Sequence, residues 1–185
     1  MYSVILYPPL RKDFINDIFF TPKIKLFALE SINTKMIWIP NETEAWEPAQ
    51  LLSSDAKSVT VKLKNGKEVK IPGAANKFDA IPSGALEEDC DNLVNLENFS
   101  EGIILHHVKK RFAVDEIYTF VGTILVAVNP YKPLNIYDVA LVDKIYNLTK
   151  FNGAVPPHVF SIGAAAVYNM RHENKDQSVL ISGNV

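Results

Sequence analysis

The stretch that most constrains the fold of this chain is YTFVGTILVAV, which runs from Tyr118 to Val128. Nearly every side chain in it is apolar and several are β-branched, so the stretch predicts a β-strand. Apolar and polar residues do not alternate along it, and a strand without alternation is covered on both faces, as inside an α/β sheet. Gly122 in its middle predicts a bend or a bulge, and Asn129-Pro130 ends the strand.

A second strand of the same kind lies further along the chain. Residues Gln177 to Ile181 form a short, apolar, β-branched run, and Ser182-Gly183 after it is a turn signal. We predict that both strands are fully buried, in an α/β sheet that two strands leave incomplete.

Helical patterns lie before and between these strands. Ser100 is a candidate N-cap for a helix that carries one apolar stripe and ends among basic residues. Residues 137–148 predict a short helix, and Pro157 suits the first turn of another. In the short helix, one side carries Val139, Val142, Ile145 and Tyr146.

Residues 36–82 show a different sequence pattern, which predicts four or five short strands separated by turns. The clearest is SVTVKLKNGKEVKIPG, residues 58–73, where apolar and polar residues alternate on either side of Asn65-Gly66. This dipeptide predicts a two-residue hairpin turn with positive φ at both positions. The segment therefore predicts a small antiparallel barrel or sandwich with one apolar face per strand.

Two segments are assigned neither to a helix nor to a strand. Residues 1–35 contain apolar clusters without a sustained pattern, so they are left as an unassigned extension, poorly ordered and independent of the domain behind it. Residues 83–99 carry an acidic run and are interpreted as a solvated linker. The run has no calcium-loop spacing, so no metal site is predicted there. Residues 100–185 then make up the α/β part.

Composition excludes several classes of protein. The formal net charge of −2 does not suggest a nucleic-acid partner, which would require a basic face. The single cysteine, Cys90, excludes an internal disulfide and fits a reducing compartment. No run of eighteen apolar residues predicts a membrane span, and the N-terminus is not a secretory signal, so the cytosol is the default location.

No self-contained catalytic motif is present: G-x-S-x-G, H-E-x-x-H, paired cysteines and G-x-G-x-x-G are all absent. One candidate ligand site is NPYKPLNIY, which directly follows the first buried strand, where α/β proteins bind ligands. Asn129 can meet a base edge, Tyr131 and Tyr137 can cover a planar ring, and Lys132 can meet a phosphate or polarise the base. The alternative is ordinary Asn-Pro turn chemistry.

Ser182-Gly183 is the other candidate. A strand that runs into a glycine turn is how a phosphate-binding loop begins, but such a loop continues as G-x-x-x-x-G-K-[ST]. Only Asn184 and Val185 follow Gly183.

Five segments, taken in order, resemble the start of a myosin motor head. IWIPNETEAWEPAQL resembles the opening of the small barrel at the front of many myosins, and NLVNLENFSEGIILHHVKKRF the segment that joins it to the motor. IYTFVGTILVAVNPYKPLNIY resembles the family's buried strand and adenine-contacting turn. PPHVFSIGAAAVYNM and DQSVLISG resemble the helix and strand before its phosphate loop. The resemblance covers Met36 to Gly183 and does not cover residues 1–35.

The resemblance implies a small Src-homology-like β-barrel followed by an incomplete α/β segment of a phosphate-loop NTPase motor domain. It implies that Asn129, Pro130, Lys132 and Tyr137 border the adenine of ATP, and that Gly183 is the first glycine of the phosphate loop. It also implies ATP and Mg²⁺ as cofactors, actin filaments and light chains as partners of the full-length protein, and a cytoplasmic, cytoskeletal location.

The family continues after this glycine with Glu-Ser-Gly-Ala-Gly-Lys-Thr, where this chain has Asn184 and Val185. We therefore expect the chain to be a truncated motor fragment without ATPase activity and with weak or no nucleotide binding, its two strands lacking sheet neighbours. Two alternatives stay open, a non-catalytic protein-binding module built on the barrel and another kind of α/β nucleotide binder.

Overall fold

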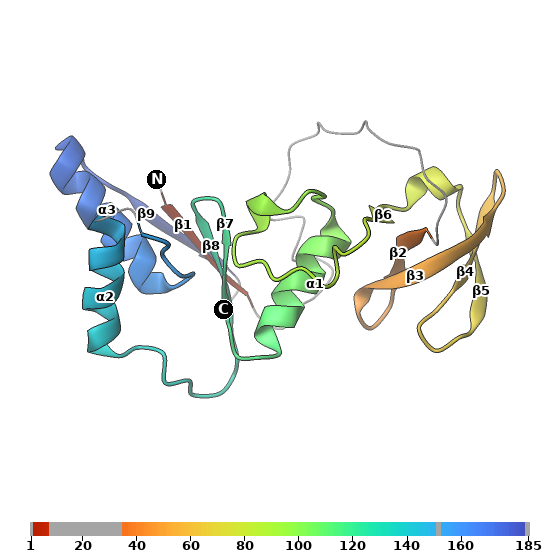
Figure 1. Ribbon diagram of the computed structural model, residues 1–185, viewed down its shortest axis with the longest axis horizontal. Helices are drawn as coiled ribbons and strands as arrows, with labels where there is room; N and C mark the ends of the chain where they lie inside the picture. Colours follow the sequence, from red (N-terminus) through yellow and green to blue (C-terminus); the bar gives the residue numbers. More distant parts are fainter. Residues whose placement is uncertain (1, 8–34, 151–152, 184–185) are drawn as a thin grey trace. The chain divides into compact units, whose positions relative to one another are not determined.

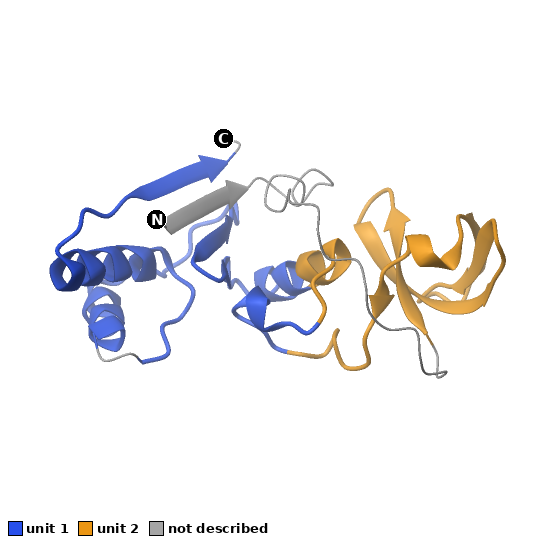
Figure 2. Ribbon diagram, turned by 90° about the horizontal axis from the view of Figure 1, so that it is seen from above, with its two compact units in different colours: residues 1–10, 89–97, 107–185 blue, residues 11–88, 98–106 orange. Residues whose placement is uncertain are grey.

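The computed structural model describes residues 2–7, 35–150 and 153–183 and divides into two compact units (Figure 2). Unit 1 consists of residues 1–10, 89–97 and 107–185, and unit 2 of residues 11–88 and 98–106. Helix α1, Glu101–Phe112, contributes its first turns to unit 2 and its last turns to unit 1. Most of the N-terminal extension, residues 8–34, lies outside the described residues.

Unit 2 is built on one antiparallel sheet with the strand order β5-β4-β3-β2-β6 (Figure 1). The prediction of several short antiparallel strands over residues 36–82 is confirmed, whereas the closure of this sheet into a barrel stays a prediction. The strands are β2, Met36–Asn41; β3, Ala45–Ser54; β4, Ser58–Lys62; β5, Glu68–Pro72; and β6, Ala80–Ile81.

The β4–β5 hairpin has the predicted glycine but not the predicted turn. Gly66 has φ +83°, whereas Asn65 is not among the residues with positive φ. The Gly66 amide donates to the Leu63 carbonyl, and the Leu63 amide donates to the Lys67 carbonyl, so the loop holds three residues. The Asn65 side chain accepts the Lys67 amide at 2.9 Å. A glycine at the last position of a three-residue loop is the next commonest hairpin after the two-residue turn.

Alternating side chains of this sheet make the core of unit 2. Ile37, Ile39, Ala49, Val59 and Val61 are all buried, as the period-two pattern requires of one face of a strand. Their burial joins three strands that are consecutive in the chain. The hydrophobic energy of this unit therefore comes from contacts between sequence neighbours.

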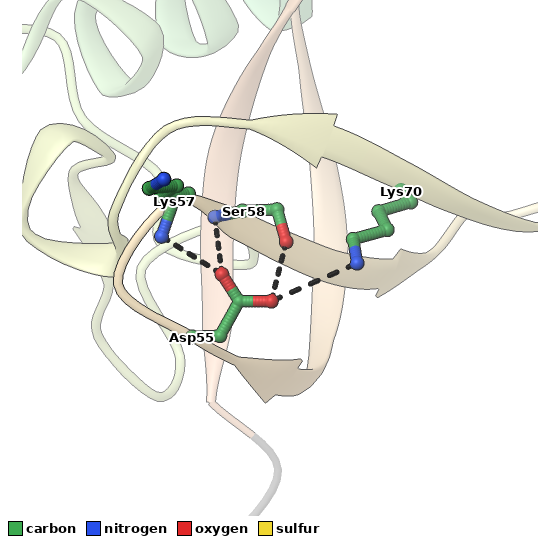
Figure 3. A network of polar contacts seen from close by, with 4 residues as sticks. All are labelled: Asp55, Lys57, Ser58 and Lys70. Atoms are coloured by element: carbon green, nitrogen blue, oxygen red, sulfur yellow. Dashed lines mark hydrogen bonds and ion pairs between the residues drawn. The ribbon is translucent and has the colours of Figure 1, made fainter.

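The turn between β3 and β4 is organised by Asp55 (Figure 3). Its Oδ1 accepts the amides of Lys57 and Ser58 at 2.8 and 2.7 Å, and its Oδ2 accepts the Ser58 hydroxyl at 2.7 Å. Lys70 Nζ lies 3.7 Å from the same Oδ2. The Ser58 hydroxyl and the two amides stabilise the charged carboxylate and lower the pKa of Asp55 to about 2.

Helix α1 begins where the sequence predicts. Ser100 Oγ accepts the Ile103 amide at 3.4 Å, which caps the helix. Gly102, the second residue of the helix, lies against the buried indole of Trp38 on β2, and a Cβ at this position would meet ring carbons at 2.3–2.7 Å. Only a glycine allows the helix to approach the tryptophan so closely.

Unit 1 contains a mixed sheet with the strand order β7-β8-β1-β9 (Figure 1). The predicted single strand at 118–128 is wrong, because β7, Tyr118–Val121, and β8, Ile124–Val128, form an antiparallel hairpin. Gly122 is the first residue of the two-residue turn and has φ +62°, as a type II′ turn requires. All residues from Leu125 to Val128 are buried, so the prediction of a strand covered on both faces is confirmed for β8.

The N-terminal extension supplies the neighbour that the sequence alone did not reveal. Strand β1, Tyr2–Tyr7, lies between β8 and β9 and pairs with both in parallel. The expectation that residues 1–35 owe nothing to the following domain is therefore wrong for residues 2–7. Pairing between strands so distant in the chain has no local sequence signal.

The prediction of a fully buried strand at 177–181 is also wrong. Strand β9, Val179–Gly183, is the last strand of the described sheet, and its five residues are exposed. A run of apolar residues indicates a strand that can be covered on both faces, but it does not supply the covering layers.

Two helices complete unit 1. Helix α2, Val139–Lys150, and helix α3, Val159–Glu173, pack against each other. Ile162 of α3 packs on the hairpin in one cluster with Leu125 and Ala127 of β8. On α2, Ile145 is fully buried, whereas Val139 and Val142 on the same predicted side are exposed.

The segment at 83–99 is more than a solvated linker. Its two compact turns include a 3-10 helix at Leu93–Asn95, and Cys90, Leu93 and Leu96 are buried. The Phe120 amide donates to the Asp91 carbonyl at 2.9 Å. Residues 89–97 therefore pack as part of unit 1.

No helix in the described part of the chain is long and apolar enough to cross a membrane.

Candidate functional site

The candidate residues at Asn129 and Gly183 lie at the same edge of the mixed sheet. Val128 at the end of β8 is in register with Tyr7 of β1, and Gly183 at the end of β9 is in register with Leu6. These three strands are parallel, so all three end at one edge, and one strand separates the two candidates. Two strand spacings correspond to about 10 Å. A ligand site of an α/β sheet lies at such a carboxyl edge.

The corner after β8 is held by a short-range hydrogen bond. Asn129 Oδ1 accepts the Tyr131 amide at 2.9 Å, and Tyr131 has φ +50°. This bond supports a left-handed backbone at a residue that rarely adopts it. Asn129 is exposed, so its Nδ2 donor is accessible to a ligand.

Lys132 is engaged by a carboxylate. Its Nζ lies 2.6 Å from Asp115 Oδ1, and both side chains are about half exposed, at 53% and 50%. The pair connects the loop after β8 to the turn that follows α1. To meet a phosphate, Lys132 would have to leave or share this partner, and an exposed ion pair of this kind contributes little stability.

Tyr137 ends the loop and is fixed by its hydroxyl and by its ring. Its hydroxyl lies 2.9 Å from the Tyr118 hydroxyl of β7. The ring centroids of His158 and Phe160 lie 5.8 and 6.2 Å from its own. Burial, and then the hydrogen bond to Tyr137, raise the pKa of the Tyr118 hydroxyl, so Tyr118 keeps its proton at physiological pH. The Tyr137 side chain is still 55% exposed and can present surface to a ligand.

His158 is the residue that sequence reasoning missed. Pro157 was predicted in the first turn of the helix, but His158 is the N-cap of α3 and Pro157 precedes it. Histidine is not among the preferred capping residues, so the pattern PPHVF gave little signal. Its ring lies inside the cluster of Tyr118, Tyr137 and Phe160, where burial lowers its pKa against a smaller, opposing effect of the Ile136 carbonyl.

A cleft of about 560 Å³ opens beside this cluster within unit 1. The residues Tyr118, Ile136 and His158 line this cleft. Two of them, Tyr118 and His158, also contact Tyr137. Buried Arg111 also lines the cleft and donates to the Tyr118 carbonyl at 3.0 Å from Nη2, and it pairs with Glu116 at 2.8 Å. The acidic residues that line the cleft are Asp89, Asp91, Asp115 and Glu116.

The side chains of this region are better suited to contact a planar base than to bind a metal ion or a triphosphate. The side-chain amide of Asn129 is exposed and the ring of Tyr137 is about half exposed, whereas the ammonium group of Lys132 is paired with Asp115. Within residues 2–7, 35–150 and 153–183 no group of three or more His, Cys, Asp or Glu residues is placed to hold a metal ion.

Comparison with known families agrees with this architecture. The family model described as "Myosin N-terminal SH3-like domain" matches residues 26–74. The model described as "Myosin head (motor domain)" matches residues 90–185, which include the mixed sheet's β7, β8 and β9. An SH3-like module followed by the first part of an α/β motor domain is therefore the class of protein that fold and comparison define.

Individual relatives are similar over most of this chain. The high molecular weight form of myosin-1 of Acanthamoeba castellanii is 28% identical over 90% of this chain and 10% of its own length. The myosin-J heavy chain of Dictyostelium discoideum is 33% identical over 80% of this chain and 6% of its own. Myosin-5 of Arabidopsis thaliana is 34% identical over 80% of this chain and 9% of its own.

The chain belongs to the myosin heavy-chain family and corresponds to the N-terminal portion of its motor domain. It spans a tenth or less of the length of these three relatives.

Proposed function

We propose that this chain supplies the adenine side of the ATP site of a myosin motor. Asn129, Pro130, Lys132 and Tyr137 would border the base, and Gly183 would begin the phosphate loop. The observation that carries the proposal is that Asn129 directly follows β8 and Gly183 ends β9, two parallel strands on either side of β1, so that both residues lie at one edge of the sheet. A nucleotide lying across this edge would reach both.

The expected affinity of these residues alone is low. Each neutral hydrogen bond contributes about 0.5–1.5 kcal/mol net. Three such contacts and the packing of one ring give about 3–4 kcal/mol before the cost of association, which corresponds to about millimolar affinity at best. The phosphates and Mg²⁺ need backbone amides, a lysine and a hydroxyl of a G-x-x-x-x-G-K-[ST] loop, of which residues 1–185 contain only the first glycine.

We further propose that these 185 residues do not hydrolyse ATP by themselves. Hydrolysis requires bound Mg²⁺ and a positioned water, and the candidate residues named above supply neither. In the whole protein, the proposed activity is ATP-driven movement on actin filaments within the cytoskeleton, with light chains as further partners.

A titration of the purified chain with adenosine, followed by NMR, tests the binding. We expect shifts of the backbone amides of residues 129–137 with a dissociation constant of about a millimolar or weaker. Asn129→Ala should reduce these shifts, whereas Asn147→Ala, which alters an exposed asparagine of α2, should not. Shifts that avoid residues 129–137 altogether would contradict the proposed site.

A turnover assay with magnesium-ATP tests the second part. Phosphate release should not exceed that of the buffer. Release above that background, abolished by Asn129→Ala and kept by Asn147→Ala, would show that the chain hydrolyses ATP unaided and would refute this part of the proposal.

A further inference from the structure

The hydrogen-bond partners of His158 dictate its protonation state. Its Nδ1 lies 3.1 Å from the Phe160 amide, which can only donate, so Nδ1 accepts and carries no proton. Its Nε2 lies 3.0 Å from the Ile136 carbonyl, which can only accept, so Nε2 carries the proton and donates it. A neutral imidazole with its proton on Nε2 is the form that satisfies both partners.

These two bonds connect two distant parts of unit 1. One caps α3 at its first turn, and the other holds the backbone of the loop after β8 at Ile136, 22 residues earlier in the chain. The residue after Ile136 is Tyr137. The His158 side chain is only 6% exposed, so its geometry is set by its neighbours rather than by solvent.

The aromatic contacts of His158 converge on the same tyrosine. The His158 ring meets the Tyr118 ring edge-on at a centroid distance of 5.0 Å and the Phe160 ring at 4.6 Å. Tyr118 holds the Tyr137 hydroxyl, and Phe160 lies against the Tyr137 ring. Each group that fixes Tyr137 therefore contacts His158 as well.

We propose that His158 is a positioning residue for the adenine site: its Nε2–H bond to the Ile136 carbonyl fixes Tyr137 as one wall of the pocket for the base. This inference rests on the proposed function of Tyr137, and it adds a residue outside the loop 129–137. His158 does not touch the base. It acts through Ile136 and Tyr137, and its capping bond to Phe160 is a separate, structural role.

Two substitutions separate these roles. The Oδ1 of Asn in His158→Asn can take the place of Nδ1 and keep the cap, but the shorter side chain does not reach Ile136. The amide of Gln in His158→Gln can reach the Ile136 carbonyl but loses the capping geometry. We expect His158→Asn to move the NMR shifts of the Tyr137 ring protons away from wild type and to weaken adenosine binding about three- to ten-fold, the equivalent of one neutral hydrogen bond. His158→Gln should keep the adenosine affinity near wild type and should move the Tyr137 shifts less than His158→Asn does, since both variants remove the imidazole that lies 5.8 Å from the Tyr137 ring.

The matched controls are His172→Asn and His172→Gln, in the exposed last turn of the same helix, which should leave the Tyr137 shifts unchanged. The proposal is overturned if His158→Asn keeps the wild-type Tyr137 shifts, or if the Asn and Gln variants change them equally.

The ¹⁵N chemical shifts of the His158 ring in the unsubstituted chain provide a measurement that needs no variant. They should report a proton on Nε2 and none on Nδ1, and the opposite tautomer would overturn the proposal even if the variants fail to fold. The Tyr137 shifts are measured without ligand. If wild type does not respond to adenosine, the proposed function fails, while these shifts still decide whether His158 positions Tyr137.

Discussion

The two sheets of this chain differ in how far apart in the sequence their partners lie. In unit 2, β2, β3 and β4 each pair with the next strand of the chain, and only β6 returns to pair with β2. In unit 1, β1 pairs with β8 and β9, so that Ser3 lies beside Ile124 on one side and Leu180 on the other. A closed loop costs more entropy as it lengthens, and such long-range pairing leaves no trace in local periodicity. The comparison teaches that the sheet carrying the candidate site depends on the part of the chain that is hardest to interpret.

The largest expected effect comes from proline in the middle of each sheet. Val4→Pro in β1 and Thr60→Pro in β4 each place a proline in a strand with neighbours on both sides. Each loses a ladder hydrogen bond and leaves an acceptor unpaired, at a cost of about 3 kcal/mol. Amide exchange should accelerate in β8 and β9 for the first and in β3 and β5 for the second. Unchanged amide exchange in β8 and β9 after Val4→Pro would contradict the pairing of β1 with both of these strands, on which the comparison depends.

A pair of helical glycines tests close packing in the two units. Gly102→Ala would place a methyl group within 2.3 Å of a Trp38 ring carbon, so we expect a loss of about 1–3 kcal/mol. At Gly163 of α3 an added Cβ meets nothing within 4 Å, and Gly163→Ala should instead stabilise by about 0.5–1 kcal/mol because alanine favours the helix. Urea unfolding of both variants measures the two free energies. If both substitutions change the free energy of unfolding in the same direction, the packing described for the two glycines is contradicted.

A smaller effect follows from the lowered pKa of His158. Its ordinary pKa of 6.5 falls on folding, so the unfolded chain binds a proton more readily than the folded one. Stability is fully present above pH 6.5 and declines as the pH falls toward the lowered value. The charged and titratable groups that share the cleft or the aromatic cluster with the His158 ring are Asp89, Asp91, Arg111, Asp115, Glu116, Tyr118 and Tyr137.

Thermal unfolding between pH 7.5 and pH 5 measures this decline. His158→Asn should flatten it, and His172→Asn should retain it. A wild-type stability that rises as the pH falls through this range would contradict the assignment.

The smallest effect is expected at Asp55, which is exposed to solvent. Its pKa of about 2, against an ordinary 3.8, means that its contribution to stability is present above pH 3.8 and is lost as the pH falls toward 2. Asp55→Asn keeps one acceptor oxygen for the two amides but loses the charge, so its melting temperature at pH 7 should fall only slightly. Asp79→Asn, another exposed carboxylate of unit 2, is the control for charge alone. A melting temperature of Asp55→Asn equal to that of the control would show that the turn does not depend on this carboxylate.

Local chemistry made much of this architecture predictable. The period-two alternation of residues 58–72 predicted the β4–β5 hairpin, and Ser100 predicted the start of α1. The position of Asn129 directly after a buried strand singled out the candidate corner. Signals of this kind work because hairpins and caps are made by residues a few positions apart.

The misses occurred where a local signal has more than one structural solution. Gly122 predicted a bend or a bulge, whereas it forms a turn that divides one predicted strand into two. The apolar run at β9 was compatible with burial, which depends on covering layers that no local pattern specifies.

The sequence by itself determined the β4–β5 hairpin, the helices, and that an asparagine-proline corner follows one strand and a glycine ends another. Only the tertiary structure decided that the first strand of the chain lies between them and that His158 holds the loop of Tyr137. The physical reason is range: capping and alternation act within a few residues, whereas pairing across more than a hundred residues is decided by the free energy of the whole sheet.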